Sequence, residues 1–443
     1  MMLRSAVGGR LRGLASCCGA PAAARGLPAL HGRRSFSVEA DGEAQQQKRR
    51  VWRWGGSAGI MGKEEDAEVS KEPALIEDVR GVGLAACGSL HSAFVVDGKL
   101  FTYGSNKYNQ LGRQLTGGGS SPDPAEVSFG ATDVGEVTQV SLGAYHSAAI
   151  TAGGNLWTWG WGGSFWYGAG ALGHGNKDAA EVPLQVQRFG AEGDEEVAQV
   201  ACGAQHTIVL TKEGRIYSTG KGDFGRLGRG DTRDELEFEE IDYFYEANDS
   251  VLAPDQPTVI VKVAAGNNFS AAMSSSGELW VWGRNDHGQL GLGEEAMGDM
   301  YSAERYPRLV RSLPAEGHKI VDFACGEHHL VVLTEEGVLY EWGARTWLEP
   351  HAVSIPDQYK DVLKNVTKLA AGEKFSFALA SNGTLFSWGS KSSGCLAQGA
   401  DCPKTIVEPT PVPSSTFGHQ KVVDVVASKS RCLAITAEDE YSA

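Results

Sequence analysis

The side chains best placed for nucleophilic chemistry lie in one glycine-rich string. Gly55-Gly56-Ser57-Ala58-Gly59 fits the Gly-x-Ser-x-Gly nucleophile elbow of α/β hydrolases. That motif needs a strand-to-helix turn, with a histidine and an acid brought to the serine by the fold. Here the string follows a Trp-Gly segment, at the place where other copies of a repeated pattern carry a glycine-rich turn. We therefore assign it to a turn and expect no catalytic serine.

Two further glycine strings match the dinucleotide-binding fingerprint. They are Gly168-x-Gly170-x-x-Gly173 and Gly220-x-Gly222-x-x-Gly225. The fingerprint requires a strand before it and a helix after it, and neither string opens a predicted helix. No Gly-Lys-Ser/Thr phosphate loop follows any glycine cluster. We expect neither a catalytic residue nor a bound cofactor.

Histidine and cysteine recur at fixed places rather than in ligand-like clusters. One repeated slot holds His91, His146, His206 and His329, and another holds Cys87, Cys202 and Cys325. Six residues separate Cys395 from Cys402, with no second cysteine pair nearby, which is weak for zinc. A repeated position is explained by packing and hydrogen bonding within each unit, so we expect no metal site.

These slots belong to a pattern that recurs about every 57 residues. A first glycine is followed about 17 residues later by a second one that ends a Trp-Gly-type strand. The first glycines are Gly88, Gly143, Gly203, Gly266, Gly326 and Gly372, with Ser428 in the seventh copy. The second glycines are Gly104, Gly160, Gly220, Gly283, Gly343 and Gly389. Between them, β-branched and aromatic runs flank a short glycine turn, which predicts a β-hairpin in each copy.

The seventh copy is divided between the two ends of the chain. Its first half is Val425–Thr436, and the Trp-Gly half would fall beyond the last residue. An orphan Trp-Gly segment, Val51–Gly55, carries Trp52 and Trp54 without a first half before it. An unpaired sheet edge is unfavourable, so we expect residues 51–55 to complete the last sheet. The prediction is an all-β, seven-bladed propeller over residues 51–437, closed by this N-terminal strand.

The repeat resembles that of the regulator-of-chromosome-condensation family. The resemblance rests on Cys-Gly-x-x-His-Ser/Thr, on Gly-x-Leu-Tyr/Trp-x-Trp-Gly, and on Gly-Gln-Leu-Gly at residues 288–291, and it covers residues 51–437. Phe269, Phe375 and Arg431 replace the histidine, and copy five lacks the Leu-Gly ending after Gly343. The resemblance implies a non-enzymatic scaffold for organellar RNA processing, translation or respiratory-complex assembly. The alternative it implies is a guanine-nucleotide exchange factor for a mitochondrial GTPase.

The tryptophan pattern differs from that of the plant ultraviolet-B receptor of the same family. That receptor has tryptophans just after the first glycine, where this chain has Ser89, Ala144, Ala204, Asn267, Glu327 and Glu373. Most tryptophans here lie in the second strand of the hairpin, where we expect them to fill the space between blades. The pattern argues against a photoreceptor.

The first 36 residues differ in composition from the rest. They contain six arginines and no acidic residue, with leucines on one helical face, which is typical of a mitochondrial transit peptide. Residues 34–37 resemble a matrix-protease site with cleavage after Phe36. We expect residues 37–50 to be a linker and 438–443 a tail, in a mitochondrial matrix protein, with a plastid address as the alternative.

Net charge and hydropathy limit the classes of partner. The formal charge is −15, and removal of residues 1–36 would take it to −21. Because nucleic-acid affinity depends on phosphate neutralisation, we expect no general nucleic-acid binding. No apolar stretch is long enough to span a bilayer, which leaves a soluble protein or one peripheral to the inner membrane. The expected partners are proteins: a mitochondrial GTPase, RNA-processing factors or assembly factors.

Two insertions into the repeat are candidate partner-binding segments. The first adds aromatic residues after the second glycine of copy two: Trp161, Phe165, Trp166 and Tyr167. The second, Asp231–Asp255, has ten acidic residues and one basic one, with candidate contacts Glu237, Glu239, Glu240, Tyr243 and Tyr245. Exposed, the first would be an aromatic anchor and the second a docking surface for a basic partner. The alternatives are a loop folded onto its own blade and a solvated loop with its aromatics tucked under.

Overall fold

The computed structural model describes most of the chain from residue 48 to residue 437. The described ranges are 48–56, 70–115, 119–130, 134–164, 168–190, 193, 195–246, 250–252, 258–296, 302–391 and 394–437. All of them belong to the second of two units, Asp41–Ala443. The expected transit peptide, most of the expected linker, the C-terminal tail and Ser57–Gly59 lie outside the described residues.

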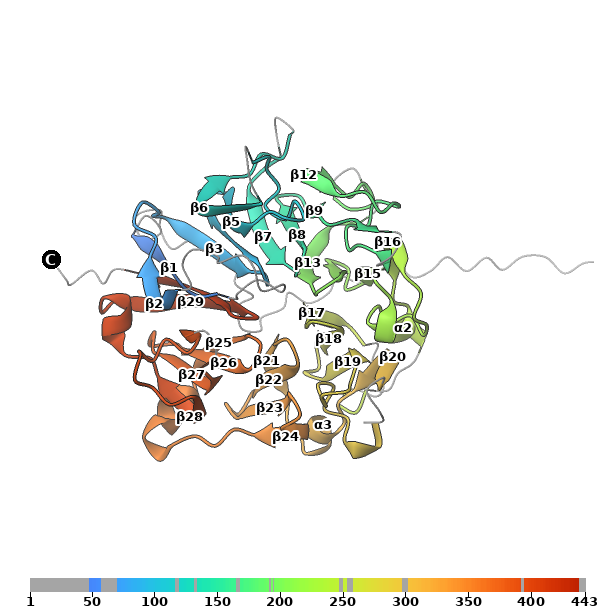
Figure 1. The fold of residues 1–443 in the computed structure, drawn as a ribbon. Coiled ribbons are helices and arrows are strands. Elements are labelled where there is room, and N and C mark those ends of the chain that lie inside the picture. The colour runs from blue at the N-terminus through green and yellow to red at the C-terminus, as the bar shows by residue number, and fades with distance from the viewer. Residues whose placement is uncertain are drawn as a thin grey trace, which may run out of the picture. The chain divides into compact units, whose positions relative to one another are not determined.

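Seven four-stranded antiparallel sheets form the blades of a propeller (Figure 1). Blade one has β3 (Val82–Cys87), β4 (His91–Val96), β5 (Lys99–Ser105) and β6 (Ser120–Glu126). Blade two has β7 (Val137–Leu142), β8 (His146–Thr151), β9 (Asn155–Gly160) and β12 (Ala180–Gln185). Blade three has β13 (Val197–Cys202), β14 (His206–Thr211), β15 (Ile216–Gly220) and β16 (Glu235–Glu240). Blade four has β17 (Ile260–Ala265), β18 (Phe269–Ser274), β19 (Leu279–Arg284) and β20 (Ala303–Leu309).

The remaining blades follow the same order. Blade five has β21 (Ile320–Cys325), β22 (His329–Thr334), β23 (Leu339–Gly343) and β24 (Trp347–Ala352). Blade six has β25 (Val366–Ala371), β26 (Phe375–Ala380), β27 (Leu385–Ser390) and β28 (Thr405–Pro411). A two-stranded ribbon, β10 (Gly163–Ser164) with β11 (Gly168–Ala169), extends from blade two. Helical turns are short: η1 (Asp223–Gly225), α2 (Tyr243–Glu246), η2 (Glu294–Ala296), α3 (Ser312–Ala315), η3 (Asp357–Tyr359), α4 (Lys360–Leu363) and η5 (Ser414–Phe417).

Blade seven joins the two ends of the described chain. Its order is β2 (Ser70–Leu75), β1 (Arg49–Gly55), β30 (Arg431–Ala437) and β29 (Lys421–Ser428). Closure by an N-terminal strand is confirmed, but β1 begins at Arg49, inside the expected linker, and β2 was not predicted. Trp54 is buried, and its Nε1 donates to the Cys395 carbonyl at 2.8 Å. Trp52 is half-buried and donates to Thr436 Oγ1 at 3.0 Å.

The hydrophobic core is divided among the interfaces between neighbouring blades. Six tryptophans of the described hairpin strands are buried there: Trp157, Trp159, Trp280, Trp282, Trp342 and Trp388. The prediction that these tryptophans fill the space between blades is confirmed. Such aromatic burial is a large part of what holds adjacent blades together.

The repeated histidines connect neighbouring blades, so the prediction of hydrogen bonds within each unit is wrong. Nε2 of each one lies within hydrogen-bond distance of the Ser or Thr hydroxyl that follows the corresponding slot of the next blade. The pairs are His91–Ser147 (2.7 Å), His146–Thr207 (2.9 Å), His206–Ser270 (3.1 Å) and His329–Ser376 (3.0 Å). Burial lowers the pKa of His91 to about 3 and that of His329 to about 4, so both rings stay neutral.

The loop that follows the third strand of a blade forms hydrogen bonds with the next blade. In blade one, the Gln110 carbonyl accepts hydrogen bonds from Ser147 Oγ at 2.7 Å and Trp159 Nε1 at 3.0 Å. In blade three, the Arg226 carbonyl accepts them from Ser270 Oγ and Trp282 Nε1. The Gly-Gln-Leu-Gly motif therefore links neighbouring blades, and we call the loop between the third and fourth strands that carries it the clasp. The leucines of this motif are buried: Leu111, Leu227, Leu290 and Leu396.

Candidate partner-binding surfaces

The first candidate segment begins with an aromatic row on blades one and two. Trp161 is half-buried against Tyr145 (ring centroids 6.1 Å apart), and Tyr145 packs against Tyr108 at 4.9 Å. The Trp161 amide also donates to the Tyr145 carbonyl at 3.0 Å. Trp161 therefore folds partly onto its own blade while keeping a solvent-facing edge. Phe165, Trp166 and Tyr167 lie outside the described residues.

Tyr145 follows Ala144, which lines the central channel of the propeller. The first strands of all seven blades line this channel, which has a volume of about 300 Å³. Burial raises the pKa of Tyr145, with smaller contributions from Tyr108 and Glu327, so its hydroxyl stays protonated at neutral pH. Glu327, like Ala144, belongs to the channel lining.

The described part of the second candidate segment contains a strand and a helical turn. Its first part is β16, the outermost strand of blade three, and α2 follows it (Figure 1). Phe238 and Phe244 are buried in the interfaces on either side of the blade. Tyr243 is half-buried against Tyr306 (centroids 5.9 Å apart) and Trp280. Tyr245 lies in α2, and its side chain is outside the described residues.

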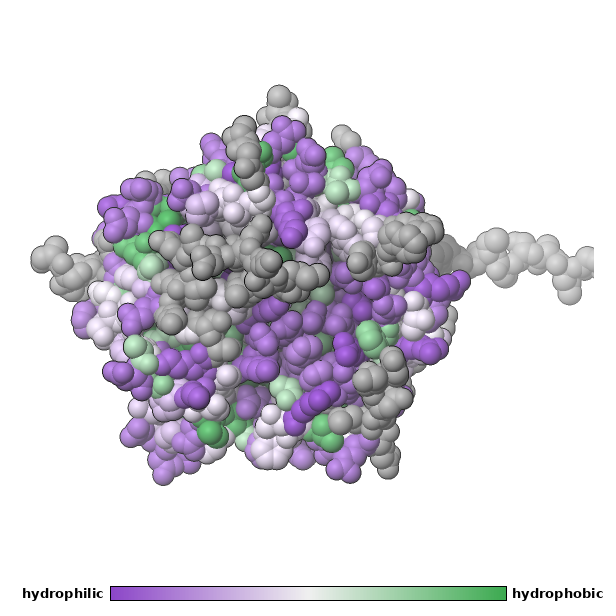
Figure 2. All heavy atoms as spheres, viewed as in Figure 1, coloured by the Kyte–Doolittle hydropathy of each residue, from purple (hydrophilic) through white to green (hydrophobic). Residues whose placement is uncertain are grey.

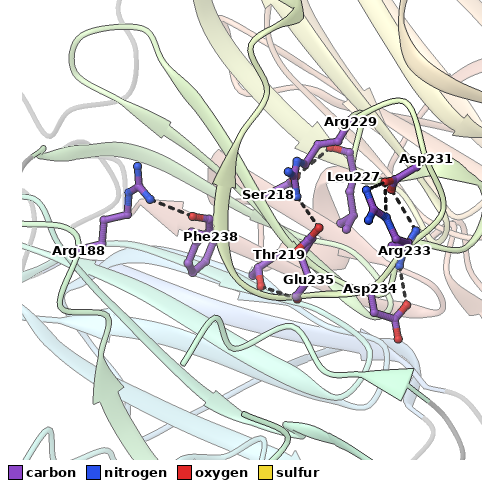
Figure 3. Close-up of polar contacts among 11 residues, drawn as sticks. Arg188, Ser218, Thr219, Leu227, Arg229, Asp231, Arg233, Asp234, Glu235 and Phe238 are labelled. Atoms are coloured by element: carbon purple, nitrogen blue, oxygen red, sulfur yellow. Dashed lines mark hydrogen bonds and ion pairs between the residues drawn. The ribbon is translucent and has the colours of Figure 1, made fainter. Parts of the chain in front are cut away.

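Polar contacts fix the beginning of the acidic segment (Figure 3). Arg229 pairs with Glu235 at 2.5 Å, and Arg233 pairs with Asp231. The Glu235 carbonyl accepts from Thr219 Oγ1 at 3.0 Å, and the Phe238 carbonyl from Arg188 at 3.2 Å. These contacts hold the backbone of β16 in place and leave the carboxylates farther along the strand to face solvent.

The carboxylates of the candidate residues differ in their surroundings. Glu237 is exposed and Glu239 is half-buried. Glu240 is half-buried and lies 4.0 Å from Arg215, at the limit of an ion pair. Asp242, which the sequence analysis did not single out, is exposed beside Tyr243. The outer side of blade three therefore carries an acidic surface next to aromatic side chains.

The structure brings the residues that follow the first candidate segment against the second one. The loop after β11 pairs with β16: Gly175 N donates to the Leu236 carbonyl at 2.9 Å, and His174 forms a bridge with Glu237. A Cβ at Gly168 would meet the Asp234 carboxylate, so these two residues also lie close together. We call the resulting surface, formed by Trp161, β10–β11, β16 and α2, the blade 2–3 surface. No sequence signal pairs these segments, because only the fold puts them side by side.

Hydrophobic residues are scattered over the visible face. Figure 2 shows hydrophilic residues gathered over its middle and only small, separate hydrophobic patches. In the part of the chain that the structure describes, no group of His, Cys, Asp and Glu could hold a metal ion. Over the same residues, no helix has the length and hydropathy of a membrane span.

A family model and several known proteins are similar to this chain. The family model of the RCC1-like domain matches residues 50–434. The chain belongs to the RCC1-like domain family. The RCC1-like chain is 30% identical over 328 residues to the ultraviolet-B receptor UVR8 of Arabidopsis thaliana, covering 72% of this chain and 67% of the receptor. It is 32% identical over 260 residues to the mitochondrial RCC1 domain-containing protein RUG3 of the same plant, covering 58% and 52%.

Other relatives share only part of their length or only the fold. The chain is 32% identical over 307 residues to the ubiquitin ligase HERC2 of Mus musculus and spans 6% of that protein. The crystal structure of Prp20p from Saccharomyces cerevisiae matches with a TM-score of 0.72 at 20% identity, covering 89% of this chain and 93% of that one. That of human WBSCR16 matches with a TM-score of 0.69 at 23% identity, covering 88% and 98%.

Proposed function

We propose that this RCC1-like propeller is a non-enzymatic mitochondrial scaffold that binds protein partners through the blade 2–3 surface. The processes we assign to it are organellar RNA processing or translation, or respiratory-complex assembly. The proposal rests mainly on one observation, the pairing of the loop after β11 with the acidic strand β16. The named relative RUG3 is mitochondrial, which supports the compartment, and the arginine-rich, acid-free residues 1–36 support import into the matrix.

The carboxylates and aromatic side chains of this surface favour a partner with a basic surface and an apolar anchor residue. Half-exposed aromatics give large contact area at low conformational cost. The carboxylates of Glu237, Glu239 and Asp242 would steer a positively charged surface toward them and raise the association rate at low salt. A net charge of −15 makes the same surface unfavourable for nucleic acid.

A matched set of surface variants tests this proposal. The tagged chain is expressed in mitochondria, and its co-purifying proteins are compared with those of Trp161→Ala and of the double variant Glu237→Lys/Glu239→Lys. We expect both variants to lose the same partner, and the charge reversal to lose it more completely at low salt. Glu349→Lys, on the exposed outer strand of blade five, is the control. Loss of the partner in the control alone, or in no variant, would contradict the proposal.

The second candidate function is guanine-nucleotide exchange on a mitochondrial GTPase. It is suggested by the fold match to Prp20p, a protein described by its binding to Gsp1p and histones. Exchange works by stabilising the nucleotide-free GTPase and needs no acid or base from the propeller. Release of mant-GDP from mitochondrial GTPases, measured with and without residues 37–443, separates the two functions. Acceleration of release would favour exchange over a scaffold.

A further inference from the structure

Outer strands of three consecutive blades are covered by the clasp of the preceding blade. One backbone N–H of each clasp donates to a carbonyl on the outer edge of the next blade. These bonds are Gly175 N to Leu236 O (2.9 Å), Gly230 N to Arg305 O (3.0 Å) and Gly293 N to Leu348 O (3.1 Å). The accepting residue always follows the one paired with the second glycine of its blade, as Gly220 pairs with Glu235 and Gly343 with Trp347. In blade six, Gly389 pairs with Ile406, so the equivalent acceptor is Val407.

Blade five has no clasp to cover Val407. Only residues 344–346 connect β23 to β24, whereas residues 221–234 connect the corresponding strands of blade three. Ala344 and Arg345 have φ of 50° and 62°, which makes a tight hairpin turn. All three amides of this turn are engaged elsewhere: Ala344 with His328 O, Arg345 with His287 O and Thr346 with Gly343 O.

At the interface between blades five and six, a side chain takes the place of the missing clasp. Trp159, Trp282 and Trp342 each donate Nε1 to a clasp carbonyl of the preceding blade. Trp388 instead donates to the carboxylate of Glu341, at 2.6 Å. Glu341 comes from β23, so a side chain of blade five fills the hydrogen-bonding role of the absent loop. The interior is thereby satisfied, while no described amide of the blade-five turn donates to the outer edge of blade six.

We infer that the open edge at β28 is a docking site for a clasp-like segment of a partner protein. Val407 is 78% exposed and Ile406 is only partly buried beside it. The segment that fits is extended, donates a backbone N–H to the Val407 carbonyl and lays an aliphatic side chain on Val407 and Ile406. Glu408, which follows Val407 in β28, is exposed, and its carboxylate favours a basic residue in the segment.

The short length of the open edge argues for a loop rather than a long added strand or a second copy of this chain. Pro409 and Pro411 lie in β28 and have no N–H, which prevents continued pairing toward the end of the strand. Only residues 405–407 are left for a contact, which matches the single hydrogen bond made by each internal clasp. This site lies on blade six and does not depend on the blade 2–3 surface.

The clasp of blade three supplies the probe for a test. A fluorescein-labelled peptide with the sequence of residues 225–230, Gly-Arg-Leu-Gly-Arg-Gly, is titrated with the full chain, and anisotropy is followed. We expect saturable binding with a Kd of about 1 mM or tighter. Val407→Lys should weaken it at least tenfold, and a peptide with serine in place of leucine should fail to bind. Val182→Lys, at an exposed valine of β12, should leave binding unchanged.

Three results of the peptide titration would overturn the inference. They are the absence of saturable binding, equal binding by Val407→Lys, and equal loss in Val182→Lys. Light scattering of the chain alone tests whether a second copy of the chain binds at this edge. A dimer that Val407→Lys dissociates would assign the edge to that second copy and would also overturn the inference. Because Val407 is exposed, we expect Val407→Lys to fold normally, and an unchanged melting temperature checks this.

Discussion

At the scale of single residues, each repeated polar side chain has a partner in a neighbouring blade. The four histidines are buried, neutral and bonded to hydroxyls of the next blade. A neutral buried imidazole lowers the stability of the folded protein in acid, because the histidine binds a proton in the unfolded chain but not in the folded one. Two blades avoid this cost by using Phe269 and Phe375 in the same slot.

The first prediction follows from His91. Its folded pKa is lowered to about 3, so stability is complete above the unfolded pKa of about 6.5 and is lost as pH falls below that value. The loss amounts to about 2 kcal/mol at pH 5 for this one histidine. We expect His91→Phe to reduce the slope of unfolding free energy against pH, between pH 5 and 6, by about one proton. Denaturant melts at each pH measure this, and an unchanged slope would contradict the assignment.

A second residue-scale prediction concerns Glu341. Burial raises the pKa of its carboxyl, with the Trp388 bond and His351 opposing, so the folded state favours the protonated form. Stability is therefore lost as pH rises from the unfolded pKa through the folded one. Glu341→Gln keeps an acceptor for Trp388 and removes the charge, so we expect it to be more stable than the wild type at pH 7 and equally stable near pH 4. Thermal melts at both pH values test the difference, and a less stable variant at pH 7 would refute it.

At the scale of elements, the inner three strands of each blade were predictable and the outer ones largely were not. Hairpin strands carry β-branched and aromatic residues around a glycine turn, and that pattern is strong. Outer strands such as β2 and β28 carry charges and prolines, because only one face and one edge pack. The contact of the blade-two loop with β16 has no local signature at all, so the blade 2–3 surface could be found only from the fold.

Within β1, the two tryptophans are not equivalent. Trp54 packs its ring against Phe377 and Phe417, with centroids 6.0 and 5.8 Å away, and is buried, whereas Trp52 is half-buried. We expect Trp54→Ala to cost about 3–5 kcal/mol of unfolding free energy and Trp52→Ala about half as much. Equilibrium unfolding in urea measures both. Equal costs would mean that β1 does not pack as described.

At the scale of the whole propeller, every blade depends on both neighbours, and blade seven depends on strands from both ends of the described chain. Histidine bonds, clasps and buried tryptophans all cross from one blade to the next. Removing β1 and β2 would therefore expose the edge of β30 and the packing faces of blades six and one. The binding surfaces proposed on blades two, three and six need this rigid frame, and the blade 2–3 surface combines segments from two blades.

Closure of the ring is tested most directly by two truncations compared in one thermal melt. A chain that lacks residues 1–47 keeps β1 and β2, and we expect it to melt cooperatively at the same temperature as the full chain. A chain that lacks residues 1–80 loses both strands, and we expect it to aggregate or to unfold without a cooperative transition. If both truncations melted at the temperature of the full chain, the N-terminal strands would not close the propeller and this account of the molecule would be wrong.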